Sequence, residues 1–324
     1  GNVISGNTNS ALYVLGLSAS NNVIEGNFIG TTASGLAALG NGYAGINVEN
    51  APGNRIGGAS AGARNLISGN ALNGVIVQFA GASNNVIQGN YIGTDTSGMA
   101  GLPNGAGLAP AGTAVAGGVD IAGAPGNRIG GEEPGAGNLI SGNWRDGVCI
   151  GGAGATNNRV QGNLIGTKAD GVSPLGNETH NVDIRTPGGA HNNLIGGDAP
   201  GAGNVIAHVG SSGAGYDGVR IRDGNTGNLV RGNSFFGNGL SATALGIDLG
   251  VNGVNANDNC DGDAGANQLQ NFPVVTNAAS AGGVTRIQGT LNSVASGSFL
   301  VQFYASPSPA SSGYGEGQVY LGAT

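Results

Sequence analysis

Charged side chains recur at two positions, two residues apart, in and just after a short phrase that is repeated along the chain. The phrase reads [Gly/Asn]-[Val/Ile]-x-[Ile/Val/Leu], as in "GVDI" at 118–121 and "GVRI" at 218–221. Apart from Glu49 in an N-terminal phrase, the charged residues at x, or two residues beyond it, are Asp120, Asp183, Arg185, Arg220, Arg222 and Asp248. Grouped carboxyl groups can act as acid and base in glycoside hydrolysis, and an arginine fork binds the carboxylate of a sugar acid well. These six residues are therefore the candidate catalytic group.

The same residues have a second interpretation that involves no catalysis. If the phrases lie side by side in the fold, aspartates and arginines of neighbouring phrases neutralise each other on a solvated face, where an ion pair contributes little stability. We prefer this interpretation and keep catalysis as the alternative. For catalysis, the long apolar insertion at 98–118 could wall a groove, or it could meet a neighbouring domain.

An Asn- and Asp-rich stretch is a candidate calcium site. Within "NANDNCDGDAGAN" (255–267) the oxygen-bearing side chains are Asn257, Asp258, Asn259, Asp261 and Asp263. Alternating oxygen ligands followed by glycine are typical of calcium-binding loops, although the glutamate that closes an EF-hand loop is missing. The alternative is an Asx-rich turn whose side chains bond to their own backbone. If calcium binds, we expect a structural ion that fastens the C-terminal part to the rest, and no other cofactor is expected.

The composition argues against two classes of partner. The 324 residues carry a net charge of −7, and the 11 basic residues form no long run, whereas nucleic-acid binding needs a concentrated basic patch. No apolar run approaches the ~20 residues that a membrane-spanning helix requires. We therefore expect neither nucleic-acid binding nor membrane insertion. Two cysteines, Cys149 and Cys260, make no disulfide framework; one disulfide and two free thiols both remain open, and free thiols are the simpler expectation.

The phrases that carry the charged residues have the pattern of short strands. Their second and fourth residues are branched and apolar while the third varies, which is the period of a strand with one buried face. The chain has 68 glycines and only 9% charged residues, so it has too few charges for a disordered chain. No stretch sustains apolar residues at helical spacing, and the frequent Gly and Asn oppose helix formation. The sequence therefore predicts an all-β protein.

A second motif, N-x-[IV]-x-G, alternates with the strand phrase. "NLISGN" occurs at 65–70 and 138–143, and the longer phrases "NVIEGNFIGT", "NVIQGNYIGT" and "NRVQGNLIGT" begin at Asn22, Asn85 and Asn158. Units of about 20–30 residues repeated in this way predict a solenoid. Gly permits tight corners, Asn tolerates left-handed geometry, and stacked Asn amides can hydrogen-bond along the axis. Seven or eight coils at ~4.8 Å each predict a rod on the order of 35 Å long, with residues one coil apart in vertical register.

On these motifs the chain resembles the right-handed parallel β-helix superfamily that includes pectate lyases. More closely, it is similar to the "N-x-I-x-G-N-x-I-G-T … GI-x-V" repeats of large bacterial secreted and cell-surface proteins. The resemblance covers roughly residues 1–250, and "DLGVNGVNANDNCDGDAGANQLQNFPVV" (248–275) resembles the segment that closes such helices. It implies a right-handed coil and an extracellular or cell-surface location. Enzymes of the superfamily use arginine, carboxylates and calcium on polysaccharides, but the Asp-Asp, Gly-His-Gly and Asn-Thr-Asp motifs of its hydrolases are missing here.

The C-terminal residues have a different pattern. Residues 272–324 alternate as four strands, "FPVVTNA", "VTRIQGTLN", "SFLVQFYAS" and "GQVYLGAT", too few for a complete sandwich. We therefore expect a parallel β-helix over 1–250, an Asn/Asp-rich closing loop over 251–271, and a small antiparallel β cap or partial Ig-like module over 272–324. Because the chain opens inside a repeat, we expect it to be part of a longer protein. The predicted role is structural or polysaccharide-interacting; the alternative is a polysaccharide lyase or glycoside hydrolase.

Overall fold

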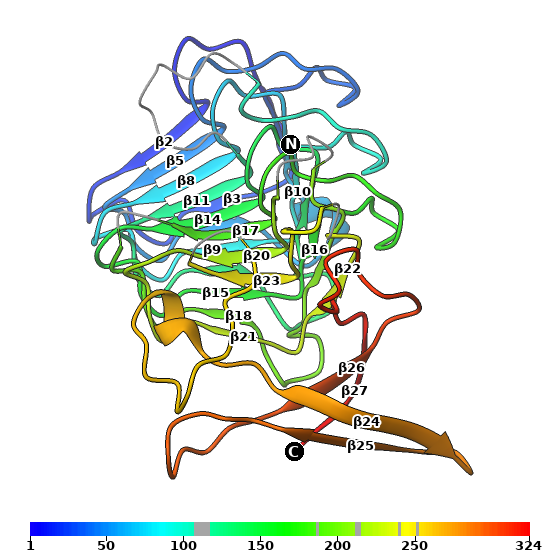
Figure 1. Cartoon of the computed structure of the whole chain (residues 1–324). Helices are drawn as coiled ribbons and strands as arrows, with labels where there is room; N and C mark the ends of the chain where they lie inside the picture. Colours follow the sequence, from blue (N-terminus) through cyan, green and yellow to red (C-terminus); the bar gives the residue numbers. More distant parts are fainter. Residues whose placement is uncertain (107–116, 186–187, 211–214, 239–240, 251–252) are drawn as a thin grey trace.

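The chain winds into a parallel β-helix, as its repeats predict. The computed structural model describes residues 1–106, 117–185, 188–210, 215–238, 241–250 and 253–324, so residues 107–116 of the insertion at 98–118 lie outside the described residues. Each complete coil contributes one strand to each of three parallel sheets, which appear in Figure 1 as stacks of arrows. Neighbouring strands of a sheet therefore come from successive coils.

The three sheets are regular in order and register. The first stacks β1 (Val3–Ile4), β4 (Phe28–Ile29), β7 (Leu66–Ile67), β10 (Tyr91–Ile92), β13 (Leu139–Ile140), β16 (Leu164–Ile165), β19 (Val205–Ala207) and β22 (Ser234–Phe236). The second stacks β2 (Leu12–Leu15), β5 (Ile46–Glu49), β8 (Val75–Gln78), β11 (Val119–Ala122), β14 (Val148–Gly151), β17 (Val182–Arg185), β20 (Val219–Ile221) and β23 (Ile247–Leu249). The third stacks β3 (Val23–Ile24), β6 (Arg55–Gly57), β9 (Val86–Gln88), β12 (Arg128–Gly130), β15 (Arg159–Gln161), β18 (Leu194–Gly196) and β21 (Leu229–Arg231). A short 3-10 turn, η1 (Ala61–Ala63), lies between β6 and β7.

Branched apolar residues of all three sheets fill the inside of the coil. In the second coil Ile46, Val48 and Ile56 are fully buried, and the same positions carry buried Val or Ile in the coils that follow, as far as Val219 and Ile221. Ile46 and Val48 are the second and fourth residues of the strand phrase, so the pattern with period two correctly predicts the buried face. Removal of this apolar surface from water is the main force that holds the coils together.

Three ladders of asparagine side chains run along the corners of the coil. The first consists of Asn2, Asn27, Asn65, Asn90, Asn138, Asn163, Asn204 and Asn233. The second consists of Asn22, Asn54, Asn85, Asn127, Asn158, Asn193 and Asn228, and the third begins at Asn7 and ends at Asn238. In most steps the backbone N–H and the side-chain Nδ2 of one asparagine both donate to Oδ1 of the next, at 2.8–3.2 Å throughout the first ladder. The predicted stacking of amides is therefore confirmed.

Glycines at the corners make room for these ladders. Gly130 ends β12 with a φ of 85°, which favours glycine. A Cβ at this position would lie 2.0 Å from the carbonyl oxygen of Gln161 and 2.5 Å from Oδ1 of Asn163. Any side chain here would displace the next asparagine of the first ladder. Steric exclusion therefore explains why glycine follows Ile129 at this corner.

The C-terminal residues form two antiparallel hairpins, and one of them closes the end of the first sheet. The hairpins pair β24 (Val274–Ala281) with β25 (Val284–Thr290) and β26 (Gln302–Ala305) with β27 (Val319–Ala323). Just before β27, Gly317 pairs with Phe235 of β22, and Glu316 accepts hydrogen bonds from the backbone and side chain of Asn238. This contact covers an open strand edge, as the cap interpretation predicts. The β24–β25 hairpin projects from the rod at its lower end (Figure 1).

Candidate functional site

The charged residues of the strand phrase form one vertical column on the second sheet. Asp120, Cys149, Asp183, Arg220 and Asp248 are direct neighbours on successive strands from β11 to β23. The predicted register is confirmed. The expected solvated face is not found, because Asp183 is only 2% exposed and Asp248 only 1%. Arginine side chains and the turns before the strands cover the column, so these charges interact in a poorly hydrated environment.

Asp120 is paired with an arginine from two coils away. Nη2 of Arg185 donates to both carboxylate oxygens of Asp120, at 3.0 and 3.1 Å. On the strand between them, Gly151 lies beside Arg185, and a Cβ there would be 2.7 Å from its Cγ. The missing side chain therefore gives the arginine a path across β14 to its partner. Burial raises the pKa of Asp120, although the charge of Arg185 acts in the opposite direction.

Asp183 is held by Arg222 rather than by Arg220, its neighbour in the column. Nε of Arg222 donates to both oxygens of Asp183 at 2.9 and 3.1 Å, and Nη2 adds a bond of 2.8 Å. Such a fork is the strongest geometry for a pair of arginine and carboxylate. Arg220 instead reaches the carbonyl oxygen of Gly250 and approaches Asp217, with Nη1 3.8 Å from Oδ2.

A second polar column, which sequence reasoning missed, lies two residues before each strand. It contains Asp146, His180 and Asp217, all almost fully buried. Each accepts the backbone N–H of the residue at the same place in the next coil: Asp146 from His180, His180 Nδ1 from Asp217, and Asp217 from Leu245, at 2.9–3.1 Å. The signal was present in the sequence as "DGVCI", "HNVDI" and "DGVRI". Nδ1 of His180 also lies 3.4 Å from Oδ2 of Asp217.

Asp217 and Asp248 place two further carboxyl groups at the end of the cluster. Oδ2 of Asp217 and Oδ1 of Asp248 are buried and have no hydrogen-bond partner among the described residues. Burial raises the pKa of Asp248 to about 7, and the neighbouring charge of Asp217 acts in the same direction.

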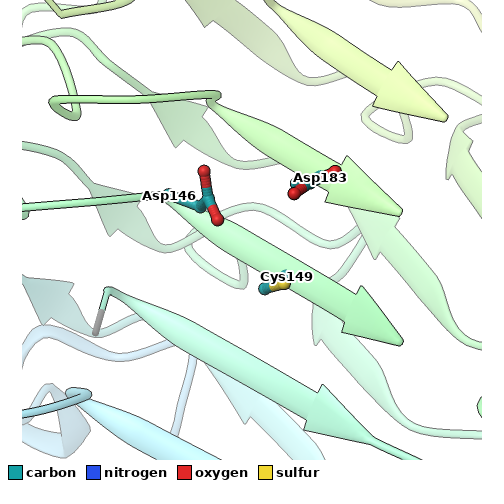
Figure 2. Close-up of side chains that lie close together, drawn as sticks. All are labelled: Asp146, Cys149 and Asp183. Carbon is teal, nitrogen blue, oxygen red and sulfur yellow. The ribbon is translucent and has the colours of Figure 1, made fainter. Parts of the chain in front are cut away.

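The centre of the cluster holds two carboxyl groups and a thiol. Figure 2 shows Asp146, Cys149 and Asp183, whose ligand atoms all lie within 4.8 Å of one another. Burial, followed by the charge of Asp183, raises the pKa of Asp146 to about 6. Burial also raises the pKa of the Cys149 thiol well above its usual range. Both cysteines are free thiols, as expected from the sequence, and Cys260 is exposed.

The carboxyl groups of the cluster are buried and outnumber its guanidinium groups, and the Arg222 side chain, which is 36% exposed, reaches solvent. Its five carboxyl groups belong to Asp120, Asp146, Asp183, Asp217 and Asp248, and its three guanidinium groups to Arg185, Arg220 and Arg222. Two surface depressions, one beside Phe236 and Pro307 and one beside Glu178 and His208, are lined by no residue of the cluster. All six candidate catalytic residues are thus brought together, but they contact each other rather than a groove. In the described part of the chain, neither of the two depressions opens onto the cluster.

The raised pKa of Asp248 predicts that the protein loses stability as pH rises from about 4 to about 7. The unfolded carboxyl titrates near 3.8 and the folded one near 7, so between these values only the folded state holds the proton. This contribution to stability is complete below about pH 4 and is lost as pH rises to about 7. At about 1.4 kcal/mol per pKa unit, we expect urea unfolding in metal-free buffer to show a stability lower by a few kcal/mol at pH 8 than at pH 5. Asp248→Asn should flatten this slope, and an unchanged slope would contradict the assignment.

The acidic loop brings together only part of the predicted calcium ligands. Carboxylate oxygens of Asp258, Asp261 and Asp263 lie within 4.8 Å of one another. Oδ1 of Asn257 accepts the backbone N–H of Phe272, and Oδ1 of Asn259 accepts from Nδ2 of Asn292. The two asparagines therefore brace the loop against the C-terminal segment, and the three aspartates are the better candidates for an ion.

Calcium binding at this loop stays a prediction. With calcium at a hundredfold excess over its dissociation constant, mass action adds about 2.7 kcal/mol to the stability of the binding state. We therefore expect calcium, and magnesium much less, to raise the thermal midpoint of the chain, measured by circular dichroism. Asp261→Asn should abolish the increase, whereas Asp170→Asn, in an exposed turn of the rod, should leave it unchanged. An equal response of both variants would rule out this site.

Comparisons with known proteins add no further identification: no family model, no curated protein and no solved structure matches the chain. Among the described residues, no helix is long and apolar enough to cross a membrane.

Proposed function

We propose that the chain is a non-catalytic β-helical segment of a larger extracellular protein, which acts as a rigid spacer or display surface. The observation that carries the proposal is the burial of the charged cluster, whose carboxylates are held by Arg185, Arg222 and backbone N–H groups of the same chain. A catalytic group needs contact with substrate, whereas these charges join five successive coils. Together with three asparagine ladders, they favour a stiff rod.

The proposed location, outside a bacterial cell, is supported by the resemblance of the repeats to secreted and cell-surface proteins.

The spacer proposal is tested by removing a whole coil. Deletion of residues 65–89 joins Arg64 to Asn90 and takes one asparagine from each ladder (Asn65, Asn70 and Asn85). We expect a folded rod that is shorter by about 4.8 Å, measured by small-angle X-ray scattering, with an unchanged strand signal. Deletion of 65–80, which breaks the register, is the control and should not fold. If both deletions unfold the chain, the coils are not interchangeable units and the spacer proposal fails.

A carbohydrate-active enzyme remains the second candidate, because Asp146 and Asp248 have pKa values of about 6 and 7. Values near neutrality are typical of general acids. A screen against polyuronides and neutral glycans, read by new reducing ends and by unsaturated products, distinguishes the two functions. Turnover that disappears in both Arg220→Ala and Asp183→Ala would establish the enzyme and overturn our preference. We expect no turnover in the unmodified chain.

A further inference from the structure

We propose that Asp146, Cys149 and Asp183 bind one thiophilic divalent cation of the zinc class, inside the charged cluster. The three residues come from two neighbouring coils: Asp146 lies in the turn before β14, Cys149 on β14 and Asp183 beside it on β17. Their ligand atoms already lie within 4.8 Å of one another (Figure 2). Ligands of a tetrahedral zinc ion are bound at about 2.0–2.3 Å, so small side-chain rotations are enough to close the site.

The thiol is the observation that points to a ligand. Cys149 is 1% exposed and free, and no described residue forms a hydrogen bond with its sulfur. It stands between Asp120 and Asp183 on the adjacent strands, whereas the same position on β8 carries the apolar Ile76. If the position served packing alone, we would expect an apolar side chain such as Ile76 there. A buried thiol among carboxylates suits a metal with affinity for sulfur.

The two carboxylates are oriented by groups that a metal would not displace. Oδ1 of Asp146 accepts from the hydroxyl of Thr179 and from the backbone N–H of His180. No described residue forms a hydrogen bond with its Oδ2. Asp183 is held by the fork of Arg222. Such outer contacts are typical of metal sites, where they fix the direction of the ligands.

The charges of the cluster also fit a cation. Five carboxyl groups face three guanidinium groups, and a divalent ion reduces the excess of negative charge that burial makes unfavourable, even when the thiol binds as the thiolate. The Cys149 thiol gives its proton to solvent and binds as the thiolate, so the metal–sulfur bond replaces the S–H bond without any redox change. Calcium, which prefers oxygen ligands, is not expected at this site.

Cobalt is a spectroscopic probe for the site. The full chain is refolded with a molar excess of Co²⁺, freed of unbound metal by gel filtration, and assayed for metal content and absorbance. We expect one cobalt per chain and a thiolate-to-cobalt charge-transfer band. Zn²⁺ added during refolding should prevent the band, and Ca²⁺ should not.

Matched variants decide whether the three residues are the ligands. Cys149→Ser should lose the band and at least tenfold in affinity, whereas Cys260→Ser, which removes the exposed thiol, should keep both. Asp146→Asn retains the thiol and should keep the band but weaken cobalt binding at least tenfold, which covers the case that Cys149→Ser does not fold. The proposal fails if the unmodified chain binds no metal, if the band follows Cys260, or if Asp146→Asn binds with unchanged affinity.

Discussion

Replacement of Asn138 by alanine is expected to destabilise the rod by about 3–5 kcal/mol. Asn138 is buried in the middle of the first ladder. Its Nδ2 donates to the carbonyl oxygen of Ile87 at 2.8 Å and to Oδ1 of Asn163 at 2.9 Å. Its Oδ1 accepts from the backbone and side chain of Asn90, both at 3.0 Å. Alanine removes all four bonds and leaves buried backbone groups of two coils without these partners, each at a cost of about 1–3 kcal/mol.

The measurement is urea unfolding followed by circular dichroism. The control is Asn2→Ala, in the exposed first position of the same ladder, where water replaces the lost bonds and we expect less than about 1 kcal/mol. Asn138→Asp separates the two halves of the amide, because it keeps the acceptor and loses the donors. Equal destabilisation by Asn138→Ala and Asn2→Ala would contradict the view that the ladders stabilise the rod through buried amides.

Replacement of Arg222 by methionine is expected to cost a similar amount, about 3–5 kcal/mol at neutral pH. Methionine keeps much of the apolar stem and removes the guanidinium that forms three hydrogen bonds with Asp183. Asp183 is 2% exposed, so the variant leaves a buried carboxylate that has lost its cation. The double variant Arg222→Met/Asp183→Asn removes that charge and should recover most of the loss.

The control for Arg222 is an exposed ion pair of the same type. Arg55 and Glu25 also lie 3.0 Å apart, but their side chains are 37% and 46% exposed, and pairs of this kind contribute about 0.2–1 kcal/mol. Arg55→Met should therefore change the free energy of urea unfolding, measured in metal-free buffer, by less than about 1 kcal/mol. If Arg222→Met is as mild as Arg55→Met, the charged cluster does not hold the coils together.

The sequence predicted the coil and its register because both follow from local rules. Val and Ile at alternate positions have one face to bury, as Val148 and Ile150 do, and glycines such as Gly130 adopt the corner geometry that other residues avoid. When every coil repeats these two signals, apolar positions stack on apolar positions and corners stack on corners. The alignment of Asp183 with Arg220 therefore followed from the sequence alone.

The burial and the partners of the charged residues were decided by the tertiary structure. A position in the strand phrase says that a side chain points away from the inside of the coil, but not what lies over it. Arg185 passes over Gly151 to reach Asp120, two coils away, and Arg222 takes the place beside Asp183 that register alone would assign to Arg220. The reach of long side chains and the turns that precede the strands do not follow the repeat. For that reason the sequence by itself determined which residues share a column, and only the folded chain determined that the carboxylates of the column are buried and bound by arginines of other coils.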